Sequence, residues 1–209
     1  MKSFYFYIFL YLSLSTTGCA QVDEIDNIKT APTVVKADEA FANVYQPLDG
    51  TWQGVFSIYE DPKPPQLDKN QLIKLTKDQA TDKRFNKSYE INVTQVYTSE
   101  SPYFQRVKIT DYNPKTKETE ISHGVNKIQN GEMWCVVHKP SGTVIHEGST
   151  DGPSTIIWQS QQDKPLKVEY FYESISNDTY EIIGYGYYDK DDTKLMPRLW
   201  FYGSYDKVK

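Results

Sequence analysis

The feature that most constrains this chain is an alternation of apolar and polar residues at a period of two, repeated between residues 48 and 209. The alternating runs are separated by short turns, such as Asn113–Lys117 and Asn130–Gly131. Successive side chains of a strand point to opposite faces, so this alternation is typical of half-buried β-strands. The 17 tyrosines and 4 tryptophans also favour pleated sheets. We therefore expect an all-β fold.

The number and order of the runs predict how the sheet is closed. About nine or ten strands, each joined to its sequence neighbour by a short turn, indicate an antiparallel meander closed into a barrel. Closure also removes exposed strand edges. Residues Gln66–Arg84 are charged, with leucines at roughly helical spacing, and predict one short helix or lid across an end of the sheet.

The first twenty residues, Met1–Ala20, have the features of an export signal. Lys2 supplies a positive start, and Phe4–Leu14 is an apolar run too short to span a bilayer. Cleavage after Ala20 would release a soluble protein, whereas cleavage before Cys19 would leave a lipid-modified cysteine, as in bacterial lipoproteins. We expect an exported protein, located in the periplasm or held as an outer-membrane lipoprotein.

The remainder divides into a tether and a folded body. Residues 21–47 are charged, contain Pro32 and predict a flexible tether, with a short helix near Lys36–Tyr45 that Asp38 could cap. Residues 48–209 are expected to form the barrel. Either processing route leaves Cys135 as the one unmodified cysteine, so no intrachain disulfide is expected.

Charge and histidine spacing exclude several functions. The formal net charge is -5 and is spread along the chain, which disfavours nucleic acid as a partner. His123, His138 and His146 lack the spacing of a metal site, so no metal or cofactor is predicted. Cys135 is expected opposite His146 across a hairpin. With no third orienting group visible, a cross-strand core pair explains this as well as a nucleophile does, and no catalytic residue is predicted.

The segment Val93–Val107 is the candidate site. Gln95 and Gln105 each lie in the apolar row of a predicted strand rather than in the polar row. If the hairpin closes about Glu100, the two amides face each other inside the barrel. A buried amide needs hydrogen-bond partners, which could be the other amide, a water or a ligand.

The start of the folded body resembles the G-x-W opening of the lipocalins and other calycins, with Trp52 as the tryptophan. The resemblance implies a lipocalin-like barrel in which Trp52 closes the base. Arg198, in the last predicted strand, would fit this picture by stacking on Trp52. If it points inward, it could instead hold a ligand carboxylate.

A second resemblance concerns the candidate hairpin. Q-V-Y at 95–97 and P-Y-F-Q-R-V at 102–107 are similar to the E-Q-A-Y … P-Y-R-Q-R-V segment of the CpcT/CpeT-type phycobiliprotein chromophore lyases. Those calycin barrels bind an open-chain tetrapyrrole and deliver it to a cysteine. Thr94 and Phe104 depart from that pattern. The residues that the resemblance implies for lining or supporting a bilin pocket are Gln95, Tyr97, Tyr103, Gln105 and Arg106.

Three functions follow as expectations. The first is an exported or lipid-anchored barrel, acting as a monomer, that binds a hydrophobic or tetrapyrrole-like small molecule. The second, implied by the resemblance alone, is a chromophore lyase that orients a bilin. The third is a packed structural or interaction barrel of the cell envelope with no ligand. A cavity on the order of several hundred Å³ would favour binding, and a filled interior would favour the structural role.

Overall fold

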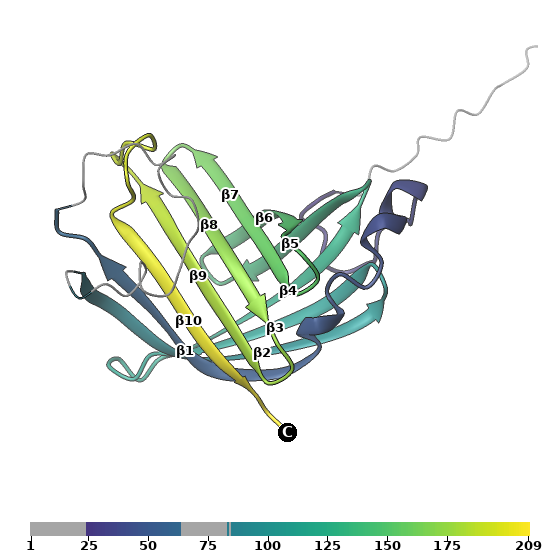
Figure 1. The fold of residues 1–209 in the computed structure, drawn as a ribbon, viewed down its shortest axis with the longest axis horizontal. Helices are drawn as coiled ribbons and strands as arrows, with labels where there is room; N and C mark the ends of the chain where they lie inside the picture. Colours follow the sequence, from purple (N-terminus) through teal and green to yellow (C-terminus); the bar gives the residue numbers. More distant parts are fainter. Residues whose placement is uncertain (1–23, 64–82, 84) are drawn as a thin grey trace, which may run out of the picture.

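The computed structural model of the protein describes residues 24–63, 83 and 85–209, which form a closed barrel of ten antiparallel strands (Figure 1). Each strand pairs with its neighbours in sequence, and β1 pairs with β10 to close the barrel. The predicted all-β meander is therefore confirmed. The strands are β1 (Gly50–Glu60), β2 (Asn86–Ser101), β3 (Phe104–Tyr112), β4 (Thr119–Gln129), β5 (Glu132–Lys139), β6 (Gly142–Thr150), β7 (Thr155–Asp163), β8 (Leu166–Ile175), β9 (Thr179–Tyr188) and β10 (Leu199–Lys207).

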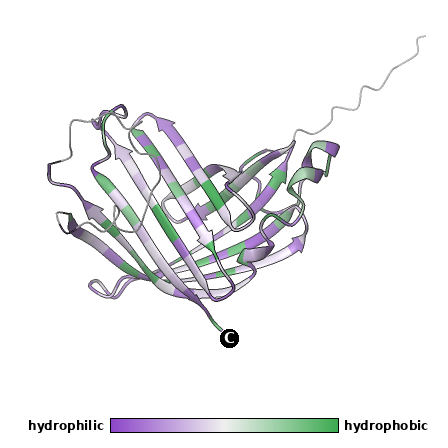
Figure 2. Cartoon of the chain, viewed as in Figure 1, coloured by the Kyte–Doolittle hydropathy of each residue, from purple (hydrophilic) through white to green (hydrophobic). Residues whose placement is uncertain are grey.

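The turns form where the sequence supplies the required backbone chemistry. Asn130 and Gly131, between β4 and β5, both adopt positive φ, at 58° and 79°. An Asn-Gly pair is favoured in such a two-residue hairpin turn. Asn113 starts the β3–β4 turn, where its side-chain oxygen accepts a hydrogen bond from the Lys115 backbone N–H at 2.9 Å. Figure 2 shows hydrophobic and hydrophilic residues interspersed along the strands that these turns connect.

The predicted pairing of the candidate hairpin is wrong in register. Gln105 lies opposite Ser99, and Gln95 lies opposite Ile109. The turn is centred near Pro102 rather than at Glu100, and a bulge at the end of β2 shifts the strands further. An extra residue on one strand of a pair shifts the register beyond it. Both amides are still buried, but they do not face each other.

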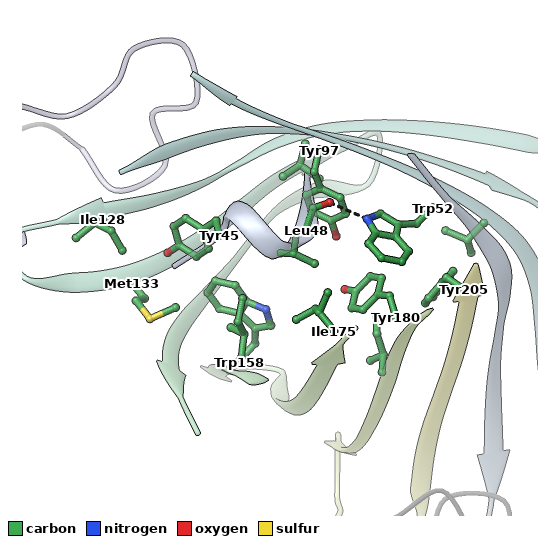
Figure 3. Packing of buried hydrophobic residues seen from close by; sticks show 14 of the residues in the cluster. Tyr45, Leu48, Trp52, Tyr97, Ile128, Met133, Trp158, Ile175, Tyr180 and Tyr205 are labelled. Atoms are coloured by element: carbon green, nitrogen blue, oxygen red, sulfur yellow. Dashed lines mark hydrogen bonds between the residues drawn. The ribbon is translucent and has the colours of Figure 1, made fainter. Parts of the chain in front are cut away.

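The described part of the expected tether, residues 24–47, packs on the barrel together with Leu48, the first residue of the expected folded body. Two short 3-10 helices, η1 (Lys36–Phe41) and η2 (Gln46–Leu48), lie in this segment. Tyr45 is 2% exposed and Leu48 is fully buried. Figure 3 shows both among the inward side chains of one barrel end, next to Trp158 and Trp52. We call residues 36–48 the plug, because they close this end of the barrel.

The plug is held at its start by Asp38, which the sequence suggested as a helix cap. Its buried carboxylate accepts the backbone N–H of Val35 at 2.8 Å and that of Gly131 at 2.6 Å. The first bond satisfies a backbone donor near the helix start, and the second ties η1 to the β4–β5 turn. Earlier in the segment, Ile25 and Ile28 pack against a cluster of Phe104, Val125 and Val136.

Two expectations fall on residues outside the described ranges. These are the helix or lid at Gln66–Arg84, of which only Lys83 is described, and the export signal with Cys19. Within the described ranges, no helix has the length and apolarity needed to cross a membrane.

Candidate ligand-binding cavity

The interior of the barrel contains a cavity of about 800 Å³, bordered by side chains from all ten strands. Ligand pockets of proteins are typically about 300–1,000 Å³. The cavity extends from the plug to the opposite end of the barrel, where β3 and β4 connect. Much of its wall is apolar, with Phe56, Val93, Ile109, Val137, Phe171 and Ile182 among the lining residues.

Two of the predicted site residues, Gln95 and Tyr97, line this cavity. The Tyr97 hydroxyl donates a hydrogen bond to Gln95 Oε1 at 2.8 Å. Burial raises the pKa of Tyr97 well above its ordinary value, so the hydroxyl remains a donor at neutral pH. The pair therefore presents polar atoms on an otherwise apolar stretch of β2.

Gln105 is fully buried, but it serves the plug and does not border the cavity. Its Nε2 donates to the Tyr45 carbonyl at 2.8 Å and to Asp49 Oδ1 at 2.9 Å. Its Oε1 accepts from Asn126 Nδ2 at 2.9 Å. The buried amide thus finds its partners within the protein and ties β3 and β4 to the plug.

Tyr103 and Arg106 also lie away from the cavity lining. Tyr103 is in the β2–β3 turn, where its carbonyl accepts the Ile128 N–H at 2.9 Å. Arg106 pairs with Glu100 at 3.0 Å and donates to the carbonyls of Ile28 and Lys29. Because inner and outer positions alternate along β3, Arg106 faces outward between Gln105 and Val107. It holds the N-terminal segment against the barrel.

Trp52 lies at the plugged end, where its Nε1 donates to the Leu48 carbonyl at 2.6 Å. Its ring is covered by Lys207, with Nζ 5.0 Å from the ring centroid. The expectation that Arg198 would cover Trp52 is wrong, because Trp52 pairs with Lys207 in the β1–β10 register. Arg198 precedes the opposite end of β10, where it forms ion pairs with Glu60 and Asp191.

Cys135 and His146 pair across β5 and β6 as predicted, and both side chains line the cavity. Burial raises the pKa of the Cys135 thiol to about 12, with a further contribution from Glu173. Because the thiolate is the nucleophilic form, this environment disfavours nucleophilic chemistry at Cys135. His146 lies 3.7 Å from Glu169, a neighbour that sequence reasoning did not identify.

Glu169, on β8, lies among several polar side chains, including the Ser160 hydroxyl, which donates to Oε2 at 3.5 Å. The Tyr188 hydroxyl donates to Oε1 at 2.6 Å, and Lys167 Nζ lies 3.2 Å from Oε2, the oxygen that faces His146. Burial raises the pKa of this carboxyl, but His146, Tyr188 and Lys167 together outweigh burial and lower it to about 2. The Glu169 carboxylate is therefore ionised at neutral pH, and its contacts join β6, β8 and β9.

Replacing Glu169 with glutamine is expected to reduce the free energy of unfolding at pH 7 by about 2 kcal/mol. The folded-state pKa lies below the ordinary 4.5 of a glutamate, so ionisation stabilises the fold above that value. The advantage of the native residue should shrink as the pH falls from about 5 towards 2. Urea unfolding of both proteins at pH 7 and pH 3 measures this. A difference that is equal at the two pH values would contradict it.

Glu173, two residues beyond Phe171, lies on the same inner face of β8 near the plug. Its side chain borders the cavity and is 8% exposed. Burial raises its pKa to about 7, and the polar groups of Trp158 and Tyr180 only partly oppose this rise. The Tyr180 hydroxyl is also buried at this end and lies near the Glu173 carboxyl. The deep end of the cavity thus holds a buried carboxyl whose ionised form is disfavoured, beside buried neutral polar groups.

Among the described residues, no group of three or more histidine, cysteine, aspartate or glutamate side chains is arranged to hold a metal ion. The described lining offers apolar walls, several carboxylates, of which Glu169 and Glu173 lie on β8, two lysines and a few neutral donors.

Comparison with known proteins finds similarity of structure but no match of sequence. No protein-family profile matches the chain, and no curated protein sequence matches it. Among solved structures, EF1p2_mFAP2b bound to DFHBI has a TM-score of 0.38 and 10% identity, covering 80% of this chain and 99% of that chain. A de novo designed fluorescence-activating beta barrel has a TM-score of 0.36 and 11% identity, covering 79% of this chain and 98% of that chain.

Proposed function

We propose that this protein binds a small, largely apolar molecule inside its barrel. The observation that carries the proposal is the cavity of about 800 Å³, which is lined by inward side chains of every strand. A protein interior is normally packed to the density of an organic crystal, with few voids larger than a water molecule. A void of this size supports binding over the alternative of a packed structural barrel.

The tetrapyrrole ligand implied by the sequence resemblance receives less support from the cavity. Tetrapyrroles of the bilin type carry two propionates, which need cationic partners. Arg106 and Arg198 are engaged elsewhere. Among the described lining residues, carboxylates outnumber lysines by five to two: Asp111, Glu118, Glu120, Glu169 and Glu173 against Lys139 and Lys167. A chromophore lyase therefore stays a second candidate that rests on the hairpin motif, and we favour a carrier or sequestering protein.

Export is part of the proposal. A lipid at Cys19 would keep the barrel at a membrane surface, where apolar molecules are abundant. The mass of the mature protein from its native host tests this point. Lipid-modified Cys19 at the new N-terminus is the expected result, and an N-terminus at Gln21 would indicate a released protein.

Titration with the neutral dye N-phenyl-1-naphthylamine tests binding. We expect a saturable rise in dye emission with one site per chain and a dissociation constant on the order of micromolar. Val137→Trp should abolish the rise, because Val137 lines the cavity and a tryptophan there would occupy it. Val55→Trp is the matched control, since Val55 lies on β1 at 38% exposure and outside the lining.

Both variants must retain the far-ultraviolet circular dichroism spectrum of the native protein. Emission that rises equally in Val137→Trp and in the native protein would show that the dye binds outside the barrel. No saturable rise in the native protein would favour the packed structural barrel.

A further inference from the structure

The carboxylate of Glu173 has no cationic partner among the described residues, although it is more than nine-tenths buried. Its polar neighbours are neutral: the indole of Trp158, the hydroxyl of Tyr180 and the thiol of Cys135. Of the two lining lysines, Lys167 is paired with Glu169, and Lys139 ends β5 at the far end of the barrel. A buried charge that lacks a partner is costly, so such a group is usually paired or neutralised.

The surroundings of Glu173 suit a cation rather than a second anion. Aromatic rings gather at this end of the cavity, with Tyr180 5.7 Å from Trp52, 6.4 Å from Tyr97 and 5.2 Å from Tyr205 between ring centroids. Figure 3 shows the rings of Trp52, Tyr97, Tyr180 and Tyr205 grouped at the plugged end, with Ile175 between Tyr180 and Trp158. The faces of aromatic rings attract cations, most strongly where water is excluded.

We propose that the ligand carries a cationic nitrogen that pairs with Glu173 at the plugged end of the cavity, while its apolar body lies along the rest of the barrel. This inference rests on the proposed binding function and specifies its ligand class as a small amphiphilic amine. The excess of lining carboxylates over lysines favours entry of such a molecule over that of a carboxylate.

Among the described groups of the deep end, Glu173 has a pKa raised to about 7, so its charge changes near neutral pH. The other titratable groups that face it are Cys135 on β5, Tyr97 on β2, Tyr180 on β9 and Tyr205 on β10, and burial raises the pKa of each. They therefore stay neutral between about pH 5 and 8. Glu169, Lys167 and His146 form their own cluster, on the far side of Phe171 along β8.

A matched series of eight-carbon compounds tests the inference by displacement of N-phenyl-1-naphthylamine from the full chain. The series is octylamine, octanol and octanoate, which differ mainly in the charge of the head group. At pH 8 we expect octylamine to displace the dye at a concentration about 10- to 100-fold lower than octanol. Octanoate should be the weakest competitor.

Two variants and a change of pH test whether the preference for octylamine over octanol arises at Glu173. In Glu173→Gln the advantage of octylamine over octanol, compared within that variant, should disappear. Glu120→Gln is the matched control, because Glu120 lines the cavity on β4 at the opposite end, and it should retain the preference. In the native protein the preference should shrink at about pH 5.5, where Glu173 is mostly protonated while the amine stays charged.

The outcomes separate the two proposals. If the dye binds but octylamine competes no better than octanol, or if none of the three compounds competes, the inference about the cation is overturned and the binding function stands. A preference that survives in Glu173→Gln also overturns it. Failure of the dye itself to bind would instead remove the binding function. The native protein alone decides the question if Glu173→Gln does not fold.

Discussion

Replacing Gln105 with leucine is expected to lower the free energy of unfolding by about 3–5 kcal/mol. The leucine side chain is similar in volume, so the loss comes from hydrogen bonding. Without the amide, the Tyr45 carbonyl, Asp49 Oδ1 and Asn126 Nδ2 lose a partner at the buried end of the barrel. A buried polar atom left unsatisfied costs about 1–3 kcal/mol. Urea unfolding followed by tryptophan fluorescence measures the change.

Gln95→Leu is the matched control, because this amide lies in the same hairpin but accepts only the Tyr97 hydroxyl. We expect it to cost about 1 kcal/mol. The two variants separate an amide that holds the plug from one that borders the cavity. Equal stability of Gln105→Leu and the native protein would mean that the amide is a tolerated core defect.

The second large effect is expected at Tyr45, the central side chain of the plug. Tyr45→Ala should lower the free energy of unfolding by about 3–5 kcal/mol, as for other large aromatic residues truncated in a core. The ring stacks on Trp158 with centroids 6.1 Å apart, and the hydroxyl donates to the Lys127 carbonyl at 3.0 Å. Both contacts hold the N-terminal segment inside the barrel end.

Tyr45→Phe keeps the ring and removes only the hydroxyl bond, so it should cost about 1–2 kcal/mol. The same urea unfolding measurement applies to both variants. A loss below about 1 kcal/mol in Tyr45→Ala would show that the barrel is stable without its plug, and residues 36–47 would then belong to the tether that their composition suggests.

The strand order follows from the sequence because alternation and turn chemistry act locally. The Asn130–Gly131 turn and the runs on either side of it predict β4 and β5 directly. The register of paired strands depends in addition on where each turn is centred and where a strand has a bulge. The β2–β3 pairing is set by the turn at Pro102 and by a bulge between Ser99 and Ser101, and neither a bulge nor the exact turn centre has a distinctive residue pattern here.

The site was harder to predict because β8 places its polar residues inward. Lys167, Glu169, Phe171 and Glu173 line the cavity, whereas Tyr170 and Tyr172 face outward. Polarity alone predicts the reverse orientation. The outward tyrosines pack in an outer cluster around Phe85, Ile183 and Trp200. Because this cluster shields them from water, the usual cost of exposing apolar residues on that face is reduced. The sequence signal that this row faces inward is Phe171, which stands between Glu169 and Glu173 in the row.

The plug was missed for a similar reason. Residues 24–48 are charged, and only a few isolated side chains, including Tyr45 and Leu48, carry the burial. Isolated apolar residues in a polar segment have no periodicity, so pattern-based reasoning reads such a segment as a linker. Their role becomes visible only once the barrel end that receives them is known.

A crystal structure of the protein in complex with N-phenyl-1-naphthylamine tests the central claim most directly. The account predicts electron density for the dye inside the barrel, in contact with Val137 and Phe171 and extending towards Trp158. Dye density confined to the outer surface, with the interior occupied by rearranged aromatic side chains, would contradict it.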